Sequence, residues 1–530
     1  MCKKQYPVID LFAGPGGLSE GFSSFGLGGK SKSPSLFSVV VSVEKEKTAH
    51  ATLMLRSYYR GLIVKGLSLT NYYAWLNGES ETYKKTVQED EVWSEAKSHA
   101  LLHELGVDLV ADEELENHIL AKLKGFDRSS VLIGGPPCQA YSLVGRARNK
   151  GNSSYSAEED HRHFLYREYL KILYRTEPSI FVMENVKGIL SSKVNGERIF
   201  PSILKDLVAP HEALGKELGK KYVIYSLVTN RRFRYGDDPA SVEGTDFLIR
   251  SEHYGIPQKR HRVILLGIEE SIDVIPDKLR ASTTTINVRD VTSGLPPLRS
   301  RLSKGGDSSE KWVKIIKEVS QELIDDLKKS EQLPELVGEV KRLLNQDKRI
   351  GLDDGGLRVE PSILNSEEQL LPLHLESWYQ DNCLNKVLNH ESRGHIKEDL
   401  KRYLFIATYG QIYGISPKAS EFPSFLAPEH KSWHSGKFAD RFRVQLSNSP
   451  SATVTSHISK DGHYFIHPDP TQCRSLTVRE AARLQTFPDN YFFMGPRTQQ
   501  YVQVGNAVPP LLARQIAQVV HGVLEKVGEE

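Results

Sequence analysis

An apolar run that stops in a cluster of glycines near the N-terminus limits the possible folds more than any other feature. Residues Val8-Ile9-Asp10-Leu11-Phe12 are followed directly by Ala13-Gly14-Pro15-Gly16-Gly17, and a stretch compatible with a helix begins at Leu18. This order predicts a strand, a tight turn and a helix. In open α/β sheets such a turn lies at the carboxyl end of a strand, where cofactors bind.

Further strand-like runs continue the pattern along the chain. They lie at residues 39–43, 131–133, 180–183, 222–228 and 263–267, and helical patterns separate most of them. Because strands and helices alternate, we predict an α/β fold whose mostly parallel sheet is covered by helices on both faces.

Two regions depart from this alternation. Residues 56–128 are polar, charged and helix-like, and they separate two predicted strands by more than a crossover needs, so we predict a helical insertion. From about residue 298 to 446 the alternation gives way to charged helical sequence and loops, which predicts a second, smaller domain. Helical patterns return at 476–487 and after Pro509-Pro510.

Composition excludes several classes of protein. The sequence contains no apolar run of about 18 residues, and its first residues do not read as a secretory leader. The cysteines are too far apart for a disulfide framework or a paired zinc motif, being Cys2, Cys138, Cys383 and Cys473. We therefore expect a cytoplasmic protein without a membrane partner and without a bound metal. The formal net charge of +2 neither requires nor excludes nucleic acid.

The first candidate site is the glycine turn together with Glu44, which ends the second predicted strand. Glycines allow a ligand to approach the backbone, and an acidic residue in this position can accept hydrogen bonds from ribose hydroxyls. The dinucleotide motif GxGxxG is not met, because its last position is Ser19. The alternatives are a purely structural turn and a solvated charge in Glu44-Lys45-Glu46-Lys47.

The second candidate is a single thiol in a rigid loop. Gly134-Gly135-Pro136-Pro137-Cys138-Gln139 follows a predicted strand, so the loop presents Cys138 at the carboxyl edge of the sheet. A lone cysteine is usually an incidental buried residue, but this loop favours a nucleophile.

Two further groups end at the same edge of the sheet. Glu184-Asn185-Val186 brings a carboxyl group that can donate a proton in a closed cleft, although Glu184 could instead cap the next helix. In Gln258-Lys259-Arg260-His261-Arg262, strand alternation sends Gln258, Arg260 and Arg262 to one face. A fork of guanidinium groups there could hold a base carbonyl or phosphates.

With these residues the sequence resembles the DNA (cytosine-5)-methyltransferase family, and the resemblance covers most of the chain in the family's order. The matching blocks are Asp10-Leu11-Phe12-Ala13-Gly14-Pro15-Gly16-Gly17, Gly135-Pro136-Pro137-Cys138-Gln139, Glu184-Asn185-Val186, Gln258-Lys259-Arg260-His261-Arg262, Leu476-Thr477-Val478-Arg479-Glu480-Ala481-Ala482-Arg483-Leu484-Gln485-Thr486-Phe487-Pro488-Asp489 and Val504-Gly505-Asn506-Ala507-Val508-Pro509. The resemblance implies a Rossmann-like, S-adenosylmethionine-dependent methyltransferase sheet with a smaller target-recognition domain.

The resemblance also implies the catalytic residues. Cys138 would attack carbon 6 of a cytosine flipped out of duplex DNA, so that carbon 5 accepts the methyl group. Glu184 would engage ring nitrogen 3 and the amino group, and Arg262 would hold the carbonyl oxygen at carbon 2. Arg260 would act in the same group by supporting the loop or a phosphate. The base that removes the carbon 5 hydrogen is not assigned.

For the cofactor, the resemblance implies an S-adenosylmethionine pocket formed from both ends of the chain. Its residues would be Phe12, Gly14, Gly17, Glu44, Pro137, Asn506 and Val508. The acidic residue that usually contacts the adenine is obscured by the insertion, and Asp108 is only a guess.

The implied domains are a catalytic domain at 1–297, a target-recognition region at 298–474 and a C-terminal segment at 475–530 that returns to the catalytic domain. Within the recognition region, the polar run Asn389-His390-Glu391-Ser392-Arg393-Gly394-His395 is either a DNA contact or a solvated loop. No methylation sequence follows from it.

The implied partner is double-stranded DNA, bound by a monomer in a prokaryotic restriction-modification or defence setting that can include a cognate nuclease. One alternative is a cytosine-5 methyltransferase acting on transfer RNA, against which the large second domain speaks. Another is a catalytically silent DNA-binding relative, which would not need Cys138, Glu184 and Arg262.

Overall fold

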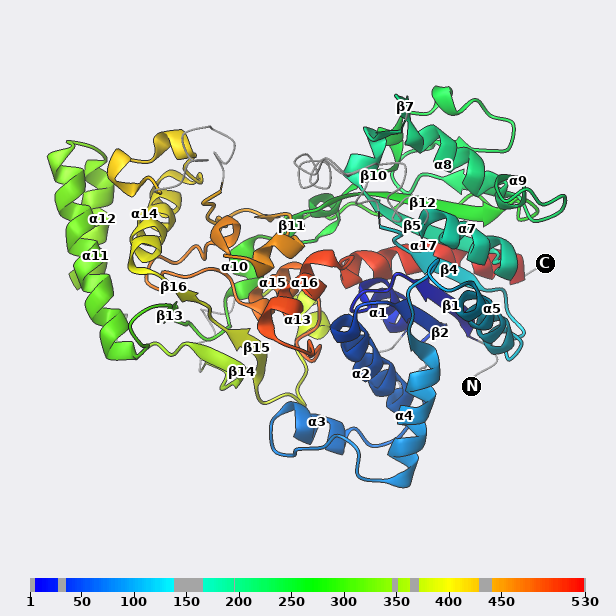
Figure 1. Ribbon diagram of the computed structural model, residues 1–530, viewed down its shortest axis with the longest axis horizontal. Helices are drawn as coiled ribbons and strands as arrows, with labels where there is room; N and C mark the ends of the chain where they lie inside the picture. Colours follow the sequence, from blue (N-terminus) through cyan, green and yellow to red (C-terminus); the bar gives the residue numbers. More distant parts are fainter. Residues whose placement is uncertain are drawn as a thin grey trace.

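In the computed structural model, the described residues are 5–26, 35–137, 165–194, 196–345, 351–362, 371–428 and 441–528. A layered α/β group and a separate group of long helices lie at opposite ends of the molecule, and short elements connect them (Figure 1).

The α/β group is built on one sheet with the strand order β3-β2-β1-β4-β5-β12-β8-β9, and β10 pairs with β12. The strands β3, β2, β1, β4 and β5 run parallel, whereas β12 is antiparallel to both β5 and β8. The bounds are β1 Tyr6–Leu11, β2 Phe37–Glu44, β3 Ala100–Leu102, β4 Val131–Gly134, β5 Ile180–Val186, β8 Tyr222–Tyr225, β9 Arg232–Phe233, β10 Leu248–Arg250 and β12 His261–Glu269. Each strand expected from the sequence is present, and the α/β prediction is confirmed.

Helices cover both faces of this sheet. On one face, α1 and α17 pack against apolar strand residues such as Val8, Ile133 and Ile264. On the other face, α5, α7 and α8 pack against residues such as Ile9, Leu132 and Leu265 (Figure 1). These helices are α1 Gly17–Ser24, α5 Leu109–Leu123, α7 Leu165–Thr176, α8 Ile199–Val208 and α17 Pro510–Gly528, and the short α9 Pro210–Ala213 follows α8. Strands with both faces covered read as continuous apolar runs, and for this reason they were visible in the sequence.

Helix α17 brings the C-terminal part of the chain back to its beginning. Its buried stripe includes Leu512, Ile516 and Val520, which recur at helical spacing. A Cβ atom on Gly21 would lie only 2.4 Å from the Cβ atom of Ala513, so α1 and α17 are in close backbone contact.

The region between β2 and β4 differs from the sequence prediction. Residues 56–128 were expected to form a helical insertion, but they also contain β3 and its crossover helix α5. Strand β3 was missed because it is only three residues long and lies at the sheet edge, where apolar patterning is weak. The helices before it are α2 Lys47–Val64, α3 Thr70–Leu76 and α4 Val87–His99, of which α3 and α4 are the additions to the crossover.

The second group has a hydrophobic core of its own. Its helices α11 Ser309–Lys329, α12 Pro334–Asn345 and α14 Lys397–Tyr413 pack around buried residues such as Trp312, Leu323 and Phe405. Four short helices lie between the two groups: α10 Val288–Thr292, α13 Leu373–Tyr379, α15 Val478–Leu484 and α16 Arg497–Asn506. Three two-stranded ribbons lie there as well: β13 Arg301–Leu302 pairs with β16 Gly394–His395, β14 Gly355–Val359 pairs with β15 Val387–Glu391, and β11 Gln258–Lys259 pairs with β17 Ser451–Ala452. A further ribbon, β6 Lys193–Val194 with β7 Glu197–Arg198, lies in the α/β half.

The polar run at 389–395 was expected to be a DNA contact or a solvated loop, and the solvated loop is wrong. Asn389 and His390 are buried in β15. Asn389 donates to the carbonyl oxygen of Phe493, and the ring nitrogens of His390 lie 2.9 Å from the Thr477 hydroxyl and 2.8 Å from the Pro296 carbonyl. Buried polar side chains are tolerated here because distant parts of the chain supply their partners.

Among the described helices, none combines the length and the apolarity that crossing a membrane requires.

Candidate active site

The glycine turn after β1 is held by the C-terminal segment. Phe12 and Gly14 have φ angles of 56° and 58°, so the turn contains left-handed backbone. A Cβ atom on Gly17 would lie 2.2 Å from the carbonyl oxygen of Val508, which makes glycine necessary there for packing within the chain. A Cβ atom on Gly14 would meet nothing within 4 Å, so the space beside this residue is open.

Glu44 is fixed at the end of β2 and is not a solvated charge. The backbone N–H groups of Gly14 and Glu46 each donate a hydrogen bond of 2.7 Å to its carboxylate. Burial raises the pKa of Glu44 above its ordinary value, although these two bonds oppose the shift. The carboxylate keeps acceptor positions free and lies beside the turn, as a contact for hydroxyl groups requires.

Asp10 lies two residues before Phe12 and is fully buried in β1. Burial raises the pKa of its carboxyl group to about 7. The base of the turn therefore contains a carboxyl group that changes charge near neutral pH.

Glu184 and Arg262 meet on adjacent antiparallel strands. The register of β5 and β12 pairs Val186 with Arg262, and the Arg262 Nε atom lies 2.7 Å from a carboxylate oxygen of Glu184. Both side chains are largely buried, with exposed fractions of 11% and 12%. Since β5 continues to Val186, Glu184 is not the cap of a following helix.

The loop after β4 packs directly against this pair. A Cβ atom on Gly135 would lie 2.9 Å from a carboxylate oxygen of Glu184, and Asn185 donates a 3.2 Å hydrogen bond to the carbonyl oxygen of Pro136. Pro137 is the last described residue before the predicted nucleophile. Cys138 and Gln139 themselves lie outside the described residues.

The expected fork of side chains from 258, 260 and 262 does not form. Arg260 is 1% exposed, and its Nη1 atom donates to the carbonyl oxygens of Val454 and Gly505 at 2.8 and 3.3 Å. Gln258 donates to the carbonyl oxygen of Leu484. Arg260 and Gln258 therefore hold backbone, and Arg262 alone of the three reaches Glu184.

The C-terminal residues predicted for the cofactor pocket differ in position. Val508 is buried against Gly17, whereas Asn506 is exposed at the end of α16. Asp108 is also exposed and caps α5, accepting hydrogen bonds from the N–H groups of Val110 and Ala111. This cap gives no support to the guess that Asp108 contacts an adenine.

Sequence reasoning missed two contacts that support the site. The hydroxyl of Tyr491 donates to the carbonyl oxygen of Pro15 in the glycine turn. The hydroxyl of Thr453 donates a 2.6 Å hydrogen bond to the carbonyl oxygen of Lys259. In both contacts the acceptor is a backbone carbonyl far away in the sequence, so side-chain patterns do not reveal it.

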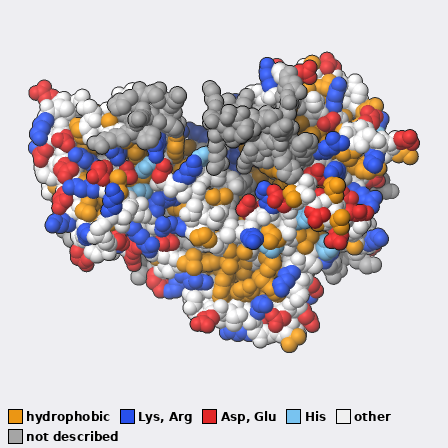
Figure 2. Space-filling view, in the orientation of Figure 1, with side chains coloured by type: hydrophobic (Ala, Val, Ile, Leu, Met, Phe, Trp, Pro, Cys, Tyr) orange, Lys and Arg blue, Asp and Glu red, His pale blue; other side chains and the backbone are white. Residues whose placement is uncertain are grey.

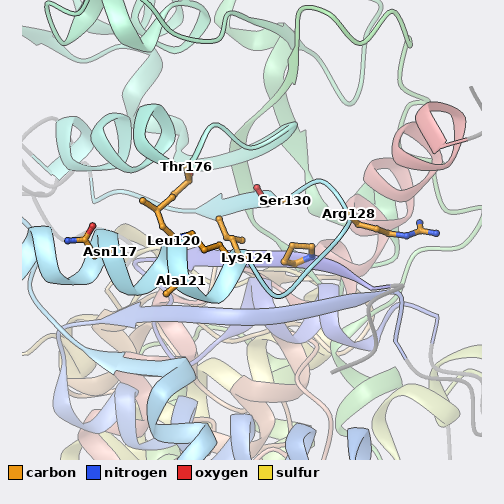
Figure 3. Close-up of a pocket in the computed structure, with 9 residues that line it drawn as sticks. Asn117, Leu120, Ala121, Lys124, Arg128, Ser130 and Thr176 are labelled. Atoms are coloured by element: carbon orange, nitrogen blue, oxygen red, sulfur yellow. The ribbon is translucent and has the colours of Figure 1, made fainter.

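A hollow of about 550 Å³ lies elsewhere, at the opposite edge of the sheet (Figure 3). Pro7 and Ser130, near the starts of β1 and β4, line it together with Asn117, Lys124 and Thr176. The candidate residues described above lie at the carboxyl ends of the parallel strands, and Arg262 reaches the same edge from the start of the antiparallel strand β12. This hollow is therefore not part of the candidate active site.

The family model described as C-5 cytosine-specific DNA methylase matches residues 110–210 and 245–521. The chain belongs to this family. Type II methyltransferase M.Bpa9945I of Bacillus paralicheniformis is 32% identical, and the alignment covers 98% of this chain and 99% of that protein. The chain is therefore a DNA (cytosine-5)-methyltransferase.

More distant relatives agree with this assignment. Type II methyltransferase M.AgeI of Thalassovita gelatinovora is 26% identical over 74% of this chain and 82% of its own length. DNA (cytosine-5-)-methyltransferase M.ApeKI of Aeropyrum pernix is 26% identical over 76% and 83%. A solved structure described as a DNA modification methyltransferase encoded within an E. coli prophage covers 98% of this chain and all of its own, with a TM-score of 0.50 and 17% identity, and it supports the fold.

Proposed function

We propose that this methyltransferase acts on a flipped-out cytosine within a specific duplex DNA sequence and forms a covalent adduct through Cys138. The observation that carries the proposal is the buried Glu184–Arg262 pair, against which the loop leading to Cys138 packs. An acid and a guanidinium group at this position suit the ring atoms that gain charge during the reaction.

Covalent attack is needed because carbon 5 of cytosine is a poor nucleophile. The Cys138 thiolate adds to carbon 6 while Glu184, which must take up a proton before the attack, passes that proton to ring nitrogen 3. An electron pair of the ring then becomes available at carbon 5. Carbon 5 then takes the methyl group as the bond from that group to the donor's sulfonium sulfur breaks, which leaves a neutral thioether. A base removes the hydrogen from carbon 5, the bond from carbon 6 to sulfur breaks, and Cys138 leaves as a thiolate. The proton on ring nitrogen 3 returns to Glu184.

Arg262 would both orient Glu184 and hold the carbonyl oxygen at carbon 2 of the ring. Its Nη1 atom donates to the carbonyl oxygen of His261, which fixes the guanidinium plane. Burial lowers the pKa of Arg262, but the carboxylate of Glu184 opposes this shift and favours the charged form. Arg260 would support the site indirectly, by donating hydrogen bonds to the carbonyl oxygens of Val454 and Gly505.

The methyl donor that fits these residues is S-adenosylmethionine, which supplies an electrophilic methyl group on a sulfonium. The open space beside Gly14 and the fixed carboxylate of Glu44 suit its ribose hydroxyls and positive charge. We assign the pocket to Phe12, Gly14, Gly17, Glu44, Pro137, Asn506 and Val508. Gly17 and Val508 would act by holding the turn against the C-terminal segment.

Sequence recognition is assigned to the second group of elements. The division at 1–297, 298–474 and 475–530 is supported by the separate core of α11, α12 and α14. Because carbon 6 is inaccessible in a stacked duplex, the target cytosine must leave the helix to reach Glu184.

The biological setting that we propose is a bacterial restriction-modification system with a cognate nuclease. The support is that several relatives are named type II methyltransferases. The enzyme would act as a cytoplasmic monomer on DNA.

Transfer of labelled methyl groups from S-adenosylmethionine to mixed-sequence duplex DNA and to bulk transfer RNA tests the proposal. The intact chain should label carbon 5 of cytosine in DNA, and Cys138→Ala and Glu184→Gln should reduce the rate by at least about a hundredfold while still binding DNA. Labelling of RNA alone would favour the transfer RNA alternative. Full activity of Cys138→Ala would rule out the covalent route.

A further inference from the structure

A second hollow, of about 370 Å³, lies at the junction between the catalytic sheet and the recognition region. Its walls come from β11, from the residues after α14 and from the segment that leads into β17. Strands β11 and β17 pair in parallel, with Lys259 opposite Ala452. The hollow is therefore attached to the strand that continues into Arg260 and Arg262.

Three cations line this hollow, namely Lys259, Lys418 and Arg443, and all three side chains are exposed. Within the described ranges, none of them forms an ion pair, and no carboxylate lines the hollow. The carboxylate of Glu421 lies nearby, where it accepts a hydrogen bond from the backbone N–H of Lys418.

Several other cations of the recognition region have acidic partners. Arg301 pairs with Asp354, Lys401 lies 2.8 Å from Asp326, and Arg441 lies 3.1 Å from Asp461. Acidic and basic side chains are intermixed over both halves of the face shown in Figure 2, so excess positive charge is not a general property of this surface. Lys259, Lys418 and Arg443 have no ion pair with the residues that the structure describes, and their grouping around one hollow indicates an anionic ligand.

The remaining wall residues argue against base reading. The amide of Gln445 is used within the chain, since it donates to the carbonyl oxygen of Tyr464 and accepts from the N–H of Ala452. The hydroxyl oxygen of Ser416 accepts from the N–H of Val444. The apolar wall is formed by Ile415, Pro417, Leu446 and Pro450. Cations beside an apolar wall fit a phosphodiester and its deoxyribose better than the polar edge of a base.

We propose that this junction pocket binds the phosphodiester backbone of the DNA substrate, independently of its sequence, beside the position of the target cytosine. The proposal rests on the proposed function. Lys259 connects the junction pocket to the candidate active site, because it lies in β11, directly before Arg260. Its carbonyl oxygen accepts a hydrogen bond from Thr453. The phosphate contact would thus fix the DNA strand relative to Arg262.

The test is the salt dependence of DNA binding by the full-length enzyme, measured by fluorescence anisotropy with a 30-base-pair duplex. The changes are Lys418→Gln and Arg443→Gln, singly and together. The control is Lys341→Gln, which removes the same charge from the exposed surface of α12 at the far end of the recognition region (Figure 1).

The slope of log K against log salt is negative, and each phosphate that a variant no longer neutralises should reduce its magnitude by about 0.9. The slope of the double variant should therefore be less steep by about 1.8. Its affinity at low salt should fall roughly tenfold. The sequence of the methylated sites should stay the same. Arg443→Lys, unlike Arg443→Gln, should keep the slope of the wild-type enzyme. A point charge suffices for a phosphate but not for bidentate base recognition.

An unchanged slope in the double variant would overturn the proposal, and so would an altered base preference at the methylated site or a slope change for transfer RNA alone. A decrease of the same size in Lys341→Gln would also overturn it. If the double variant does not fold, the single variants supply the slope. Methyl transfer to DNA by the unmodified enzyme is measured in parallel, so failure of the proposed function is seen separately.

Discussion

At the scale of single residues, Arg260 shows how a buried charge can support a site without touching the substrate. The residue is 1% exposed, and its guanidinium group donates to backbone carbonyls of two other segments, at Val454 and Gly505. Burial lowers the pKa of Arg260 well below its ordinary value. A buried charge destabilises the protein unless it is hydrogen-bonded, so Arg260 needs these two carbonyl acceptors. The same two bonds join the segments that contain Val454 and Gly505 to the start of β12.

We expect Arg260→Met to destabilise the protein by about 2 kcal/mol or more, because two buried carbonyl groups lose their donor. Urea denaturation followed by tryptophan fluorescence measures this change in stability. Arg289→Met is the matched control, since the Arg289 side chain is 52% exposed and should change stability by less than about 0.5 kcal/mol. Equal stability of the two variants would contradict the supporting role of Arg260.

Asp10 gives a prediction on pH. Its pKa is raised from 3.8 to about 7 in the folded protein, so between these values the folded chain binds more protons than the unfolded chain. The contribution of this group to stability therefore falls as the pH rises from about 4 to 7 and is constant above that range. Asp10→Asn should remove this dependence.

The measurement is the difference in unfolding midpoint between the wild-type protein and Asp10→Asn at pH 5 and pH 8. The variant should gain more stability relative to the wild-type protein at pH 8 than at pH 5. A difference that is the same at both values would show that Asp10 does not titrate near neutral pH.

At the scale of elements, the added helix α3 is fastened to the root of the recognition region. Arg358 in β14 donates to the carbonyl oxygens of Leu76 and Trp75 at 2.7 and 3.0 Å. Its guanidinium carbon lies 5.4 Å from the ring centroid of Trp75 and 5.3 Å from that of Phe492. The insertion thus contacts both the recognition region and the C-terminal segment.

Replacing Arg358 with alanine should loosen this attachment by about 1–3 kcal/mol, because two carbonyl groups and two aromatic rings lose their partner. Hydrogen exchange should become faster in residues 65–99 and stay unchanged in the central sheet. Arg342→Ala, on the exposed side of α12, is the control. Faster exchange throughout the chain would indicate global destabilisation instead.

The elements also show how far the sequence could be interpreted. Strands β1, β4 and β5 were predicted because both faces are buried and their residues are continuously apolar. Strand β3 and the buried run at 389–395 were misjudged, since their signals are short or depend on partners about a hundred residues away. The residues of the candidate site were predicted one by one from the family resemblance. The role of Arg260 in holding backbone could not be predicted, because its acceptors are the backbone carbonyls of Val454 and Gly505, far away in the sequence.

At the scale of the whole molecule, α17 completes the core of the first domain. Removing residues 509–528 would expose the strand face that contains Val8 and Ile264 and would take away the contact of Ala513 with Gly21 in α1. We expect the truncated chain to be insoluble or to lose S-adenosylmethionine binding, measured by calorimetry. A soluble truncated chain with unchanged cofactor affinity would show that α17 is dispensable.

The contact between α1 and α17 also affects how the protein is made. During synthesis, α1 must wait for a partner that lies far later in the sequence. Contacts of such long sequence separation form late, because a long loop must close first. During synthesis the apolar face of the first strands stays uncovered, and chaperones can bind it. A methyltransferase built in this way becomes competent only after translation has passed α17, so interrupted synthesis yields no partly active enzyme.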